Sequence, residues 1–210
     1  MEKFTTLRAI AAPLLRINID TDAIIPSREM KRVSKDGLAE GLFAGWRYQS
    51  PGSREENPDF ILNQEPYRQA RILLTGVNFG CGSSREHAVW ALREWGIRAI
   101  IAPSFGSIFQ GNCVRNGIVP VVLDNASVEA LARQVEADPA RNQVTVDLQQ
   151  LTVTAPDGSR HGFSLPDADR EMLLEGLDSI AVTLKRDAEI LAFRDSDRQR
   201  RPWIYLPTTW

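Results

Sequence analysis

The sequence is poor in the residues that bind metals and form covalent cross-links. Its 210 residues include two cysteines, Cys81 and Cys113, and two histidines, His87 and His161. The cysteines lie too far apart for a CxxC redox or zinc element, and two thiols do not make a disulfide framework. These four residues form no clustered metal-ligand pattern. We therefore expect no metal site in this chain and interpret both cysteines as small, partly buried thiols.

Long apolar runs and a strong charge of one sign are also missing. No segment approaches the apolar length of a membrane-spanning helix. The formal net charge of -2 argues against a large nucleic-acid-binding surface. The first fifteen residues carry Arg8 inside their apolar stretch and are broken by Pro13, unlike a secretory signal peptide. We therefore expect a cytoplasmic protein without nucleic-acid or membrane partners.

The chain divides into regions of different composition. Residues 4–25 show short apolar patterns, which predict strands that end near residues 18–22. Residues 26–68 are rich in Gly, Ser, Pro and charge, and an irregular segment of this length inside a compact domain is typically functional. We expect a single domain over residues 1–210, with a loop excursion at about 26–68 and a C-terminal tail at about 200–210.

Strands and helices alternate after residue 70. We expect strands over 70–77, 97–102 and 118–123, and helices over 83–95, 104–115 and 127–137. Ser127 is a plausible N-cap for the third of these helices. The alternation predicts a parallel sheet with right-handed crossovers. A period-2 pattern over 143–165 with an Asp157-Gly158 turn predicts a hairpin, and two last helices are expected over 167–176 and 186–196.

The segment most informative about chemistry is residues 78–88, NFGCGSSREHA. It joins a predicted buried strand to a predicted helix, which is where open α/β sheets place their ligands. Gly80 and Gly82 allow a sharp turn and close approach of a ligand to the backbone. We expect Ser83 to Arg85 at the helix N-terminus, where free N–H groups and the helix dipole favour anions.

Three familiar glycine-loop motifs do not fit this segment. A dinucleotide fingerprint requires a third glycine where Arg85 stands, a P-loop requires a lysine, and a nucleophile elbow requires Gly-x-Ser-x-Gly. The remaining interpretation is an anion site with two hydroxyls and a guanidinium that binds a carboxylate through two hydrogen bonds. The structural alternative is a tight turn with capping serines. His87 is interpreted first as a packed, hydrogen-bonded residue.

The segment GCGSSREHA resembles the signature of the aconitase family's swivelling domain. Five further segments share the resemblance: NIDTDAIIP at 18–26, GWRY at 45–48, NPDF at 57–60, APSF at 102–105 and GLDSI at 176–180. Together they resemble the bacterial small subunits of 3-isopropylmalate dehydratase from residue 4 to about 193. The resemblance implies an α/β fold, a swivelling β/β/α domain with a mixed sheet core and flanking helices, which closes over the active site of a separate large subunit.

The resemblance also implies roles for three residues of the glycine loop. Ser83 matches the position of the catalytic base, and Ser84 and Arg85 match positions that contact a substrate carboxylate. We therefore predict Ser83 and Arg85 as catalytic and Ser84 as substrate-binding. A serine hydroxyl is a weak acid, so its alkoxide needs strong local stabilisation. A helix N-terminus and an adjacent guanidinium supply it in a site closed to water.

Three more substrate-binding candidates lie earlier in the chain. Asp20 and Asp22 follow the first predicted strands and are expected to orient Arg85 or Ser83; the alternative is a purely structural role in Asx-type turns. Arg28 lies in the loop where members of the family select the substrate's side group. Residues 27–31, SREMK, depart here from the aromatic-leucine pair that relatives commonly carry before the lysine.

The resemblance finally implies a partner and a reaction. Members of this family polarise the substrate hydroxyl with a [4Fe–4S] cluster, and clusters of this kind are held by cysteine thiolates. Two cysteines are too few, so we expect the cluster on a large partner subunit and no cofactor in this chain. The implied activity is that of a heteromeric hydro-lyase interconverting 2- and 3-isopropylmalate, a small hydroxy-dicarboxylate, in leucine biosynthesis. The alternatives are a related hydro-lyase for a citraconate- or homoaconitate-type substrate and a non-catalytic anion-binding protein.

Overall fold

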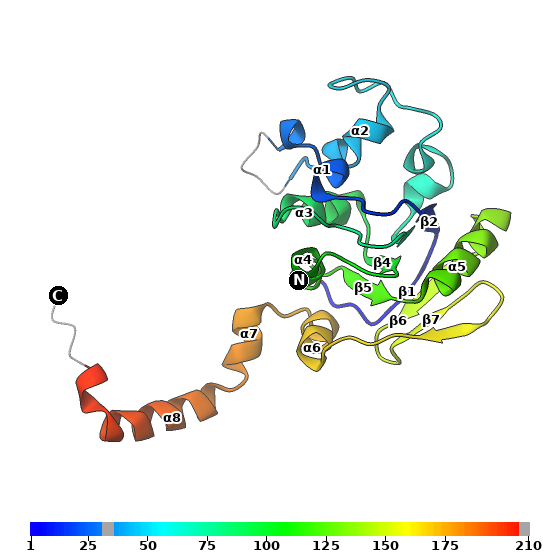
Figure 1. Ribbon diagram of the computed structural model, residues 1–210. Helices are drawn as coiled ribbons and strands as arrows, with labels where there is room; N and C mark the ends of the chain where they lie inside the picture. The colour runs from blue at the N-terminus through cyan, green and yellow to red at the C-terminus, as the bar shows by residue number, and fades with distance from the viewer. Residues whose placement is uncertain (31–35, 206–210) are drawn as a thin grey trace. The chain divides into compact units, whose positions relative to one another are not determined.

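The computed structural model describes residues 1–30 and 36–205 and divides the chain into two parts. We call Met1–Gly176 unit 1 and Leu177–Trp210 unit 2, and describe each by itself. None of the helices in the described ranges is long and apolar enough to cross a membrane. Figure 1 traces the chain with the labels used below.

A four-stranded parallel sheet forms the centre of unit 1. Its strands are β2 (Ala11–Leu14), β3 (Ile72–Thr75), β4 (Ala99–Ala102) and β5 (Val119–Val122), in that order. The inner strands β3 and β4 are buried along their whole length, as their continuous apolar sequences predict. The outer strands carry Pro13 and Pro120, which an edge strand tolerates because one side of its backbone needs no ladder hydrogen bonds.

A separate antiparallel sheet completes the strands of unit 1. Its order is β1 (Thr6–Ala9), β6 (Val144–Asp147), β7 (Thr152–Thr154) and β8 (Arg160–Gly162). β7 and β8 form the predicted hairpin, with Thr154 opposite Arg160. The predicted α/β fold with a mixed sheet core is confirmed, and the mixture consists of two sheets. Ile10 alone separates β1 from β2, so the chain passes directly from one sheet into the other.

Helices cover the parallel sheet. Figure 1 shows α3 (His87–Trp95) and α4 (Ser107–Arg115) on one side and α5 (Asn125–Ala137) on the other. α5 packs across β2, β3 and β4 through a buried stripe. This stripe consists of Val128, Leu131, Ala132 and Val135. α6 (Asp167–Glu175) packs against α4.

Three of the expected helix starts are wrong: α3, α4 and α5 begin at His87, Ser107 and Asn125, where 83, 104 and 127 were expected. α5 begins at Asn125, because the Asp124 carboxylate caps it by accepting a hydrogen bond from the Ser127 N–H at 2.9 Å. The N-cap residue is therefore Asp124, and Ser127 lies inside the first turn of the helix as the donor to it. α3 begins at His87, four residues later than expected. The residues before it are held in a loop by long-range hydrogen bonds, described with the site below.

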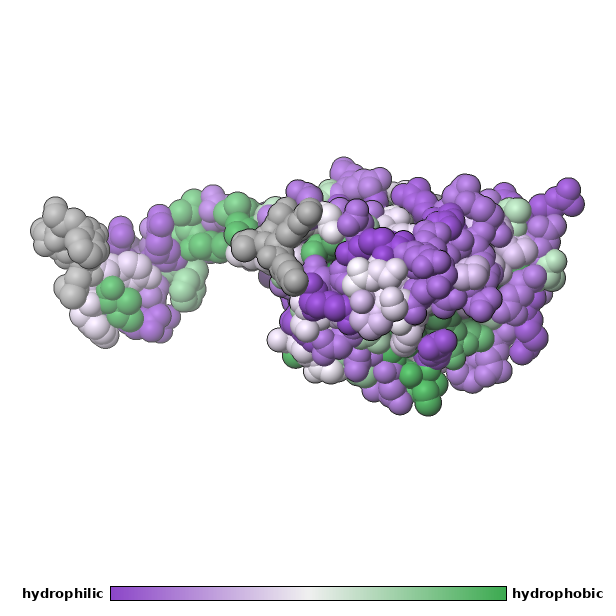
Figure 2. Space-filling model, turned by 90° about the horizontal axis from the view of Figure 1, so that it is seen from above, coloured by the Kyte–Doolittle hydropathy of each residue, from purple (hydrophilic) through white to green (hydrophobic). Residues whose placement is uncertain are grey.

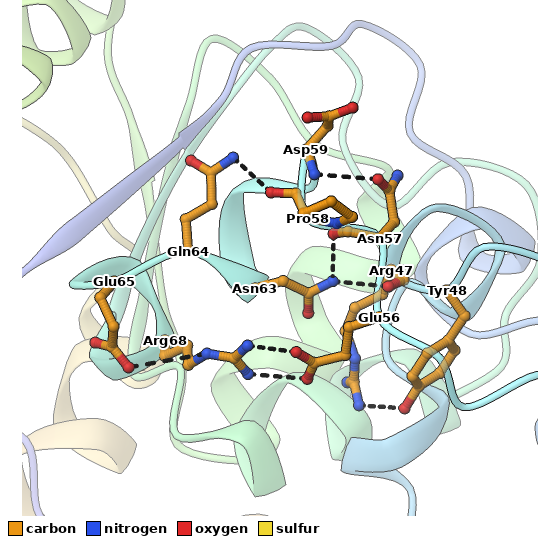
Figure 3. A network of polar contacts seen from close by, with 10 residues as sticks. All are labelled: Arg47, Tyr48, Glu56, Asn57, Pro58, Asp59, Asn63, Gln64, Glu65 and Arg68. Atoms are coloured by element: carbon orange, nitrogen blue, oxygen red, sulfur yellow. Dashed lines mark hydrogen bonds and ion pairs between the residues drawn. The ribbon is translucent and has the colours of Figure 1, made fainter.

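In its described residues, 26–30 and 36–68, the excursion consists of short turns, and side chains tie those between residues 47 and 68 together (Figure 3). The buried Asn63 amide donates to the carbonyls of Arg47 and Asn57, at 2.7 and 2.8 Å. Arg68 pairs with Glu56 through its two terminal guanidinium nitrogens, Nη1 and Nη2. The regular elements are α1 (Thr21–Ile24), which precedes it, η1 (Ser27–Glu29), η2 (Ala39–Gly41), α2 (Ala44–Arg47), η3 (Ile61–Asn63) and η4 (Tyr67–Gln69).

The excursion is anchored to α3 by one carboxylate. Glu94 accepts hydrogen bonds from the three consecutive N–H groups of Gly37, Leu38 and Ala39, at 2.6, 2.5 and 2.8 Å. The guanidinium of Arg47 donates to the Ala39 carbonyl at 2.6 Å and lies over the Trp95 ring. Burial lowers the pKa of Arg47, although the neighbouring Tyr48 acts in the opposite direction.

In its described residues, 177–205, unit 2 consists of helices without a buried apolar core. α7 (Ser179–Leu184) was not predicted from the sequence, and α8 (Asp187–Arg200) is longer than the expected 186–196. A short 3-10 turn, η5 (Pro202–Ile204), follows in the predicted tail, and residues 206–210 of that tail lie outside the described residues. Asp197 is the buried residue of α8, where its carboxylate accepts hydrogen bonds from Arg201 and Tyr205 at 2.6 and 2.9 Å.

Candidate functional site

The glycine loop lies at the carboxyl ends of β2 and β3, as predicted. Two single bridges continue the parallel pairing beyond the strands, one between Asp20 and Cys81 and one between Phe79 and Phe105. The Thr21 N–H donates to the Cys81 carbonyl at 2.9 Å. Three loops, which follow β2, β3 and β4, are thus joined by backbone hydrogen bonds at one edge of the sheet. We call this edge the glycine-loop edge.

Gly80 is required by close packing as well as by its backbone conformation. Its φ is 73°, and a Cβ built there would lie 2.1 Å from the Phe109 ring of α4. Gly106, in the loop after β4, is equally confined, since its Cβ would lie 2.7 Å from the Gly80 carbonyl oxygen. The glycine loop therefore rests directly on an aromatic ring and on the neighbouring loop, with no room for a side chain at either position.

The Ser83 hydroxyl lies between a second hydroxyl and a guanidinium. Its oxygen is 2.8 Å from Oγ1 of Thr21 and accepts a hydrogen bond from Nε of Arg85 at 2.7 Å. The Ser83 N–H donates to the same Thr21 oxygen at 3.2 Å. Thr21 is buried, at 1% exposure, so its hydroxyl is held in place by packing. This arrangement places two potential donors on the oxygen that was predicted to act as a base.

Arg85 is held on its other side by Asp22. The Nη2 atom of the guanidinium lies 2.6 Å from the Asp22 carboxylate, while Nε reaches Ser83. The prediction that an aspartate of the first loop orients Arg85 thus has a geometric counterpart in Asp22. The planar guanidinium contacts Ser83 through Nε and Asp22 through Nη2. Neither of these two contacts uses Nη1.

The contact of the Asp20 side chain is structural, like the Asx-type turn that was the alternative to a role in orienting Arg85 or Ser83. Its carboxylate caps α1 by accepting a hydrogen bond from the Ala23 N–H at 2.7 Å. The consecutive residues Asp20, Thr21 and Asp22 therefore have different contacts: the first with the backbone of α1, the second with Ser83 and the third with Arg85. Asp20 fixes the short helix that presents the other two side chains.

The remaining predicted substrate residues make fewer contacts. Ser84 is exposed beside Ser83, and its carbonyl accepts a weak hydrogen bond from Asn112 of α4 at 3.4 Å. Arg28 lies on η1 and pairs with Glu29 at 3.4 Å. Within the described ranges, no hydrogen bond or ion pair joins Arg28 to Thr21, Asp22, Ser83 or Arg85. Lys31, at the end of the atypical loop, lies outside the described residues.

The predicted helix N-terminus at Ser83 is wrong. Gly82, with φ of 98°, turns the chain, and residues 83–86 remain a loop up to the start of α3 at His87. The hydrogen bonds between Ser83 and the Thr21 hydroxyl, one of them donated by the Ser83 N–H, compete with a helical turn at these residues. The groups that contact the Ser83 oxygen are therefore the Thr21 hydroxyl and the Arg85 guanidinium, and the first turn of the helix lies further along the chain.

The other candidate nucleophiles and bases lie apart from this cluster. His87 packs on Trp90, with ring centroids 4.7 Å apart, and its buried Nδ1 makes no hydrogen bond with the described part of the chain. Cys113 is buried, and desolvation raises the pKa of its thiol well above the usual value, so it is neither a ready nucleophile nor a ready metal ligand. Cys81 is half-buried. Within 1–30 and 36–205, no three His, Cys, Asp or Glu side chains are grouped for a metal ion.

Thr21 is the residue of this cluster that sequence reasoning missed. It stands between the two aspartates that were selected, and threonine in a short turn-like segment carries no signal of its own. Its contact with Ser83 joins residues 62 positions apart. The alternation of buried and charged residues in NIDTDAII is the available signal, because it marks Thr21 as the position between two outward-facing acids.

Comparisons with known proteins agree over almost the whole chain. Residues 1–126 match the family described as the aconitase C-terminal domain, and residues 129–167 match the family described as LeuD_N. A 3-isopropylmalate dehydratase small subunit from Cupriavidus necator is 66% identical over 206 residues, covering 98% of this chain and 99% of that protein. One from Roseobacter denitrificans is 48% identical over 204 residues, covering 97% and 100%.

A solved structure shows the same fold. The crystal structure of 3-isopropylmalate dehydratase from Methanocaldococcus jannaschii aligns with a TM-score of 0.62 and 24% sequence identity. The alignment covers 90% of this chain and 99% of that one. At this identity the structural likeness concerns the fold alone. The comparison of function rests on the two small subunits that are 66% and 48% identical.

Proposed function

This chain belongs to the aconitase C-terminal domain family and, within it, to the small subunits of 3-isopropylmalate dehydratase, and from that membership we propose its function. It is the small subunit of a hydro-lyase that interconverts 2- and 3-isopropylmalate by dehydration and rehydration. The observation that carries the assignment of its catalytic group is the Ser83 hydroxyl, held between Thr21 and Arg85 at 2.8 and 2.7 Å.

Ser83 acts as the general base in this proposal. Dehydration removes a proton from the carbon next to a carboxylate, and the Ser83 oxygen receives that proton. The oxygen must first be an alkoxide, which the hydroxyl of Thr21 and Nε of Arg85 stabilise by donating hydrogen bonds. Both donors are already in position, so no reorganisation is required when the negative charge forms. In the rehydration direction Ser83 returns the proton to carbon.

Arg85 and Ser84 bind the substrate carboxylate in this proposal. With Nε on Ser83 and Nη2 on Asp22, the guanidinium offers Nη1 and the outer edge of its plane to an anion. The exposed Ser84 adds a hydroxyl beside it. Asp22 fixes the plane of Arg85, so it is a positioning residue. Arg28 is our candidate for contact with the side group of the substrate, because η1 follows α1 directly.

We propose that the iron–sulfur cluster and the rest of the active site belong to a large partner subunit. The chain has two cysteines, and one of them, Cys113, is buried with a raised thiol pKa, so it does not offer the thiolates that such a cluster needs. When bound on the partner, the cluster supplies Lewis-acid polarisation of the substrate hydroxyl. An enzyme of amino-acid biosynthesis is expected in the cytoplasm.

The purified chain alone is expected to be colourless and inactive. Iron and sulfide are to be measured after anaerobic reconstitution, with the chain alone and with the large subunit. We expect stoichiometric [4Fe–4S] in the pair and none in this chain. A stoichiometric cluster in this chain alone would contradict the two-subunit proposal.

The substrate is tested by assaying the reconstituted pair on a panel of hydroxy acids. We expect 3-isopropylmalate to have the highest kcat/KM, above citramalate-type and homoaconitate-type substrates. A higher kcat/KM on one of the other substrates would identify the protein as a subunit of a related hydro-lyase. Absence of turnover on the whole panel, with a loaded cluster, would favour a binding protein.

Replacement of Thr21 by valine is expected to lower kcat by about tenfold to a hundredfold. Valine fills the same buried volume but removes the hydroxyl, and a hydrogen bond to a charged group contributes about 1.5–3 kcal/mol. Thr21→Ser keeps the hydroxyl and is expected to retain most of the activity. Steady-state kinetics of both variants in the assembled pair decides this role. Equal kcat for Thr21→Val and the wild type would show that Arg85 alone supports Ser83.

A further inference from the structure

Two amide side chains of α4 lie inside unit 1. Polar side chains are mostly found at protein surfaces, and the face of unit 1 in Figure 2 is mostly purple, hydrophilic surface. Asn112 and Asn116 are instead buried, with exposures of 4% and 9%. Because buried polar groups are almost always hydrogen-bonded, the partners of these two amides indicate their role.

Asn116 contacts the last residue of the loop 83–86. Its Nδ2 donates to Oε1 of Glu86 at 2.6 Å and to the carbonyl of Asn112 at 2.9 Å. Glu86 is the N-cap residue of α3, but its side chain makes no capping hydrogen bond to that helix. The Asn116 carbonyl accepts a hydrogen bond from Arg93, in the last turn of α3. Asn116 is therefore joined to α3 at both of its ends.

Asn112 reaches the same loop one turn earlier along α4. Its Oδ1 accepts a hydrogen bond from Nη2 of Arg115. A guanidinium only donates, so this contact identifies the amide oxygen and leaves the NH₂ group for another partner. That group donates to the Ser84 carbonyl at 3.4 Å. This contact is long, whereas the bond from Asn116 is short and has a charged acceptor, which makes it the stronger of the two.

The two asparagines belong to one face of α4. Phe109, Asn112 and Asn116 follow one another at spacings of three and four positions, which place residues on the same helix face. Phe109 supports the beginning of the glycine loop, since a Cβ on Gly80 would lie 2.1 Å from its ring. This face of α4 therefore contacts the glycine loop at its beginning, middle and end.

The loop lies between this face and the segment that follows β2. Ser83 and Arg85 contact Thr21 and Asp22, whereas residues 84 and 86 contact α4. Consecutive residues thus alternate between two supports. A shift on the α4 side would move the Ser83 oxygen relative to its donors and to a substrate, and a misplacement of about 1 Å costs roughly 10²-fold in rate.

We propose that Glu86 and Asn116, assisted by Asn112, are positioning residues that hold Ser83 and Arg85 in their productive geometry. They act through the loop, because their hydrogen bonds toward it end on residues 84 and 86. The inference rests on the proposed function and adds a second support for its catalytic groups. Asp22 holds Arg85 from the other side, so loss of the α4 support is expected to lower kcat more than it raises KM.

The first test compares two changes of Glu86 in the full chain, assembled with the large subunit. Glu86→Met keeps the length of the side chain and removes the acceptor, and we expect kcat per complex with a loaded cluster to fall at least tenfold, with KM within threefold. Glu86→Gln keeps Oε1 as an acceptor and is expected to retain kcat within threefold. The matched control, Gln110→Met, makes a similar change at a half-buried position of α4 outside this face, and both values are expected to stay unchanged.

A reversed pair tests the contact itself. Asn116→Asp places a second carboxylate against Glu86 and is expected to lower kcat at least tenfold. Addition of Glu86→Gln to this variant restores one donor and one acceptor with their places exchanged. We expect it to recover at least fivefold of the lost kcat, and a double variant no more active than Asn116→Asp would count against the pairing.

Hydrogen exchange of the free chain gives a readout that needs neither the partner nor turnover. In Glu86→Met the amides of Ser83 and Arg85 are expected to exchange at least tenfold faster, while those of β3 and β4 stay unchanged. A structural role alone would lower the melting temperature without this local change. Wild-type kcat in Glu86→Met, or unchanged exchange of the two loop amides, would overturn the inference. Failure of the wild-type pair to turn over isopropylmalate counts against the proposed function, and the exchange measurement then decides the inference alone.

Discussion

Ser83→Ala is expected to reduce kcat by at least about 10²–10⁴-fold, the usual cost of losing a general base, while the substrate still binds. Alanine removes the oxygen on which Thr21 and Arg85 converge. The Ser83 N–H keeps its acceptor on Thr21, and the backbone loses only the long hydrogen bond from the Arg85 N–H to the Ser83 hydroxyl, at 3.4 Å. KM is therefore expected to change much less than kcat. The measurement is steady-state kinetics of the assembled pair, with equilibrium binding of an unreactive substrate analogue.

Ser84→Ala is the matched control for this experiment. It removes a neighbouring hydroxyl that is exposed and has no part in the Thr21–Arg85 arrangement. We expect it to raise KM with a smaller effect on kcat. If Ser83→Ala kept the wild-type kcat, the base would lie elsewhere, and His87, with its unsatisfied Nδ1, would be the first residue to consider.

Arg85→Lys is expected to lower kcat and raise KM together, each by more than tenfold. The guanidinium reaches Ser83 with Nε and Asp22 with Nη2 at 2.7 and 2.6 Å, and still presents an edge to the substrate. A lysine ammonium is a single point of charge at the end of a flexible stem, so it does not replace this planar fork. Net charge is unchanged by the substitution, which separates geometry from long-range electrostatics.

The pair of outcomes distinguishes Arg85 from a simple surface ion pair. An exposed pair typically contributes about 0–1 kcal/mol, and its loss would leave the kinetics nearly intact. KM and kcat both within about twofold of wild type would mean that Arg85 has a structural role only. Asp22→Asn is the accompanying variant: it keeps an acceptor for Nη2 but removes the negative charge, and we expect an intermediate loss that appears mainly in KM.

The sequence predicted best where its signals were local. The buried strands β3 and β4 are continuous apolar runs, and the glycines and serines between β3 and α3 predict a sharply turned loop at the carboxyl end of a strand, where the structure has one. Local sequence patterns did not predict which distant segments pair. Nothing local shows that β1 pairs with β6, or that the strands divide between two sheets.

The errors at the site have the same origin. The start of α3 was placed too early because Ser83 looks like a cap, whereas contact with a threonine 62 residues away fixes it in a loop. Thr21 was overlooked for the same reason. In unit 2, α7 was missed because its six residues are too few for a periodic pattern to be recognised.

The backbone hydrogen bonds between the three loops of the glycine-loop edge determine how the proposed site is lost on denaturation. Gly80 donates to Ile19 at 2.7 Å, Phe79 donates to the carbonyl of Ser104 at 3.1 Å, and Gly106 donates to Phe79 at 2.9 Å. These bonds extend the ladder of the core sheet, so the loops belong to the same cooperative unit as the strands. Heat or denaturant should therefore remove the hydrogen-exchange protection of the loop amides and the secondary-structure signal of the sheet at one midpoint, without an intermediate that keeps the sheet and loses the loops. Protection of these loop amides would then report directly on the unfolding of unit 1.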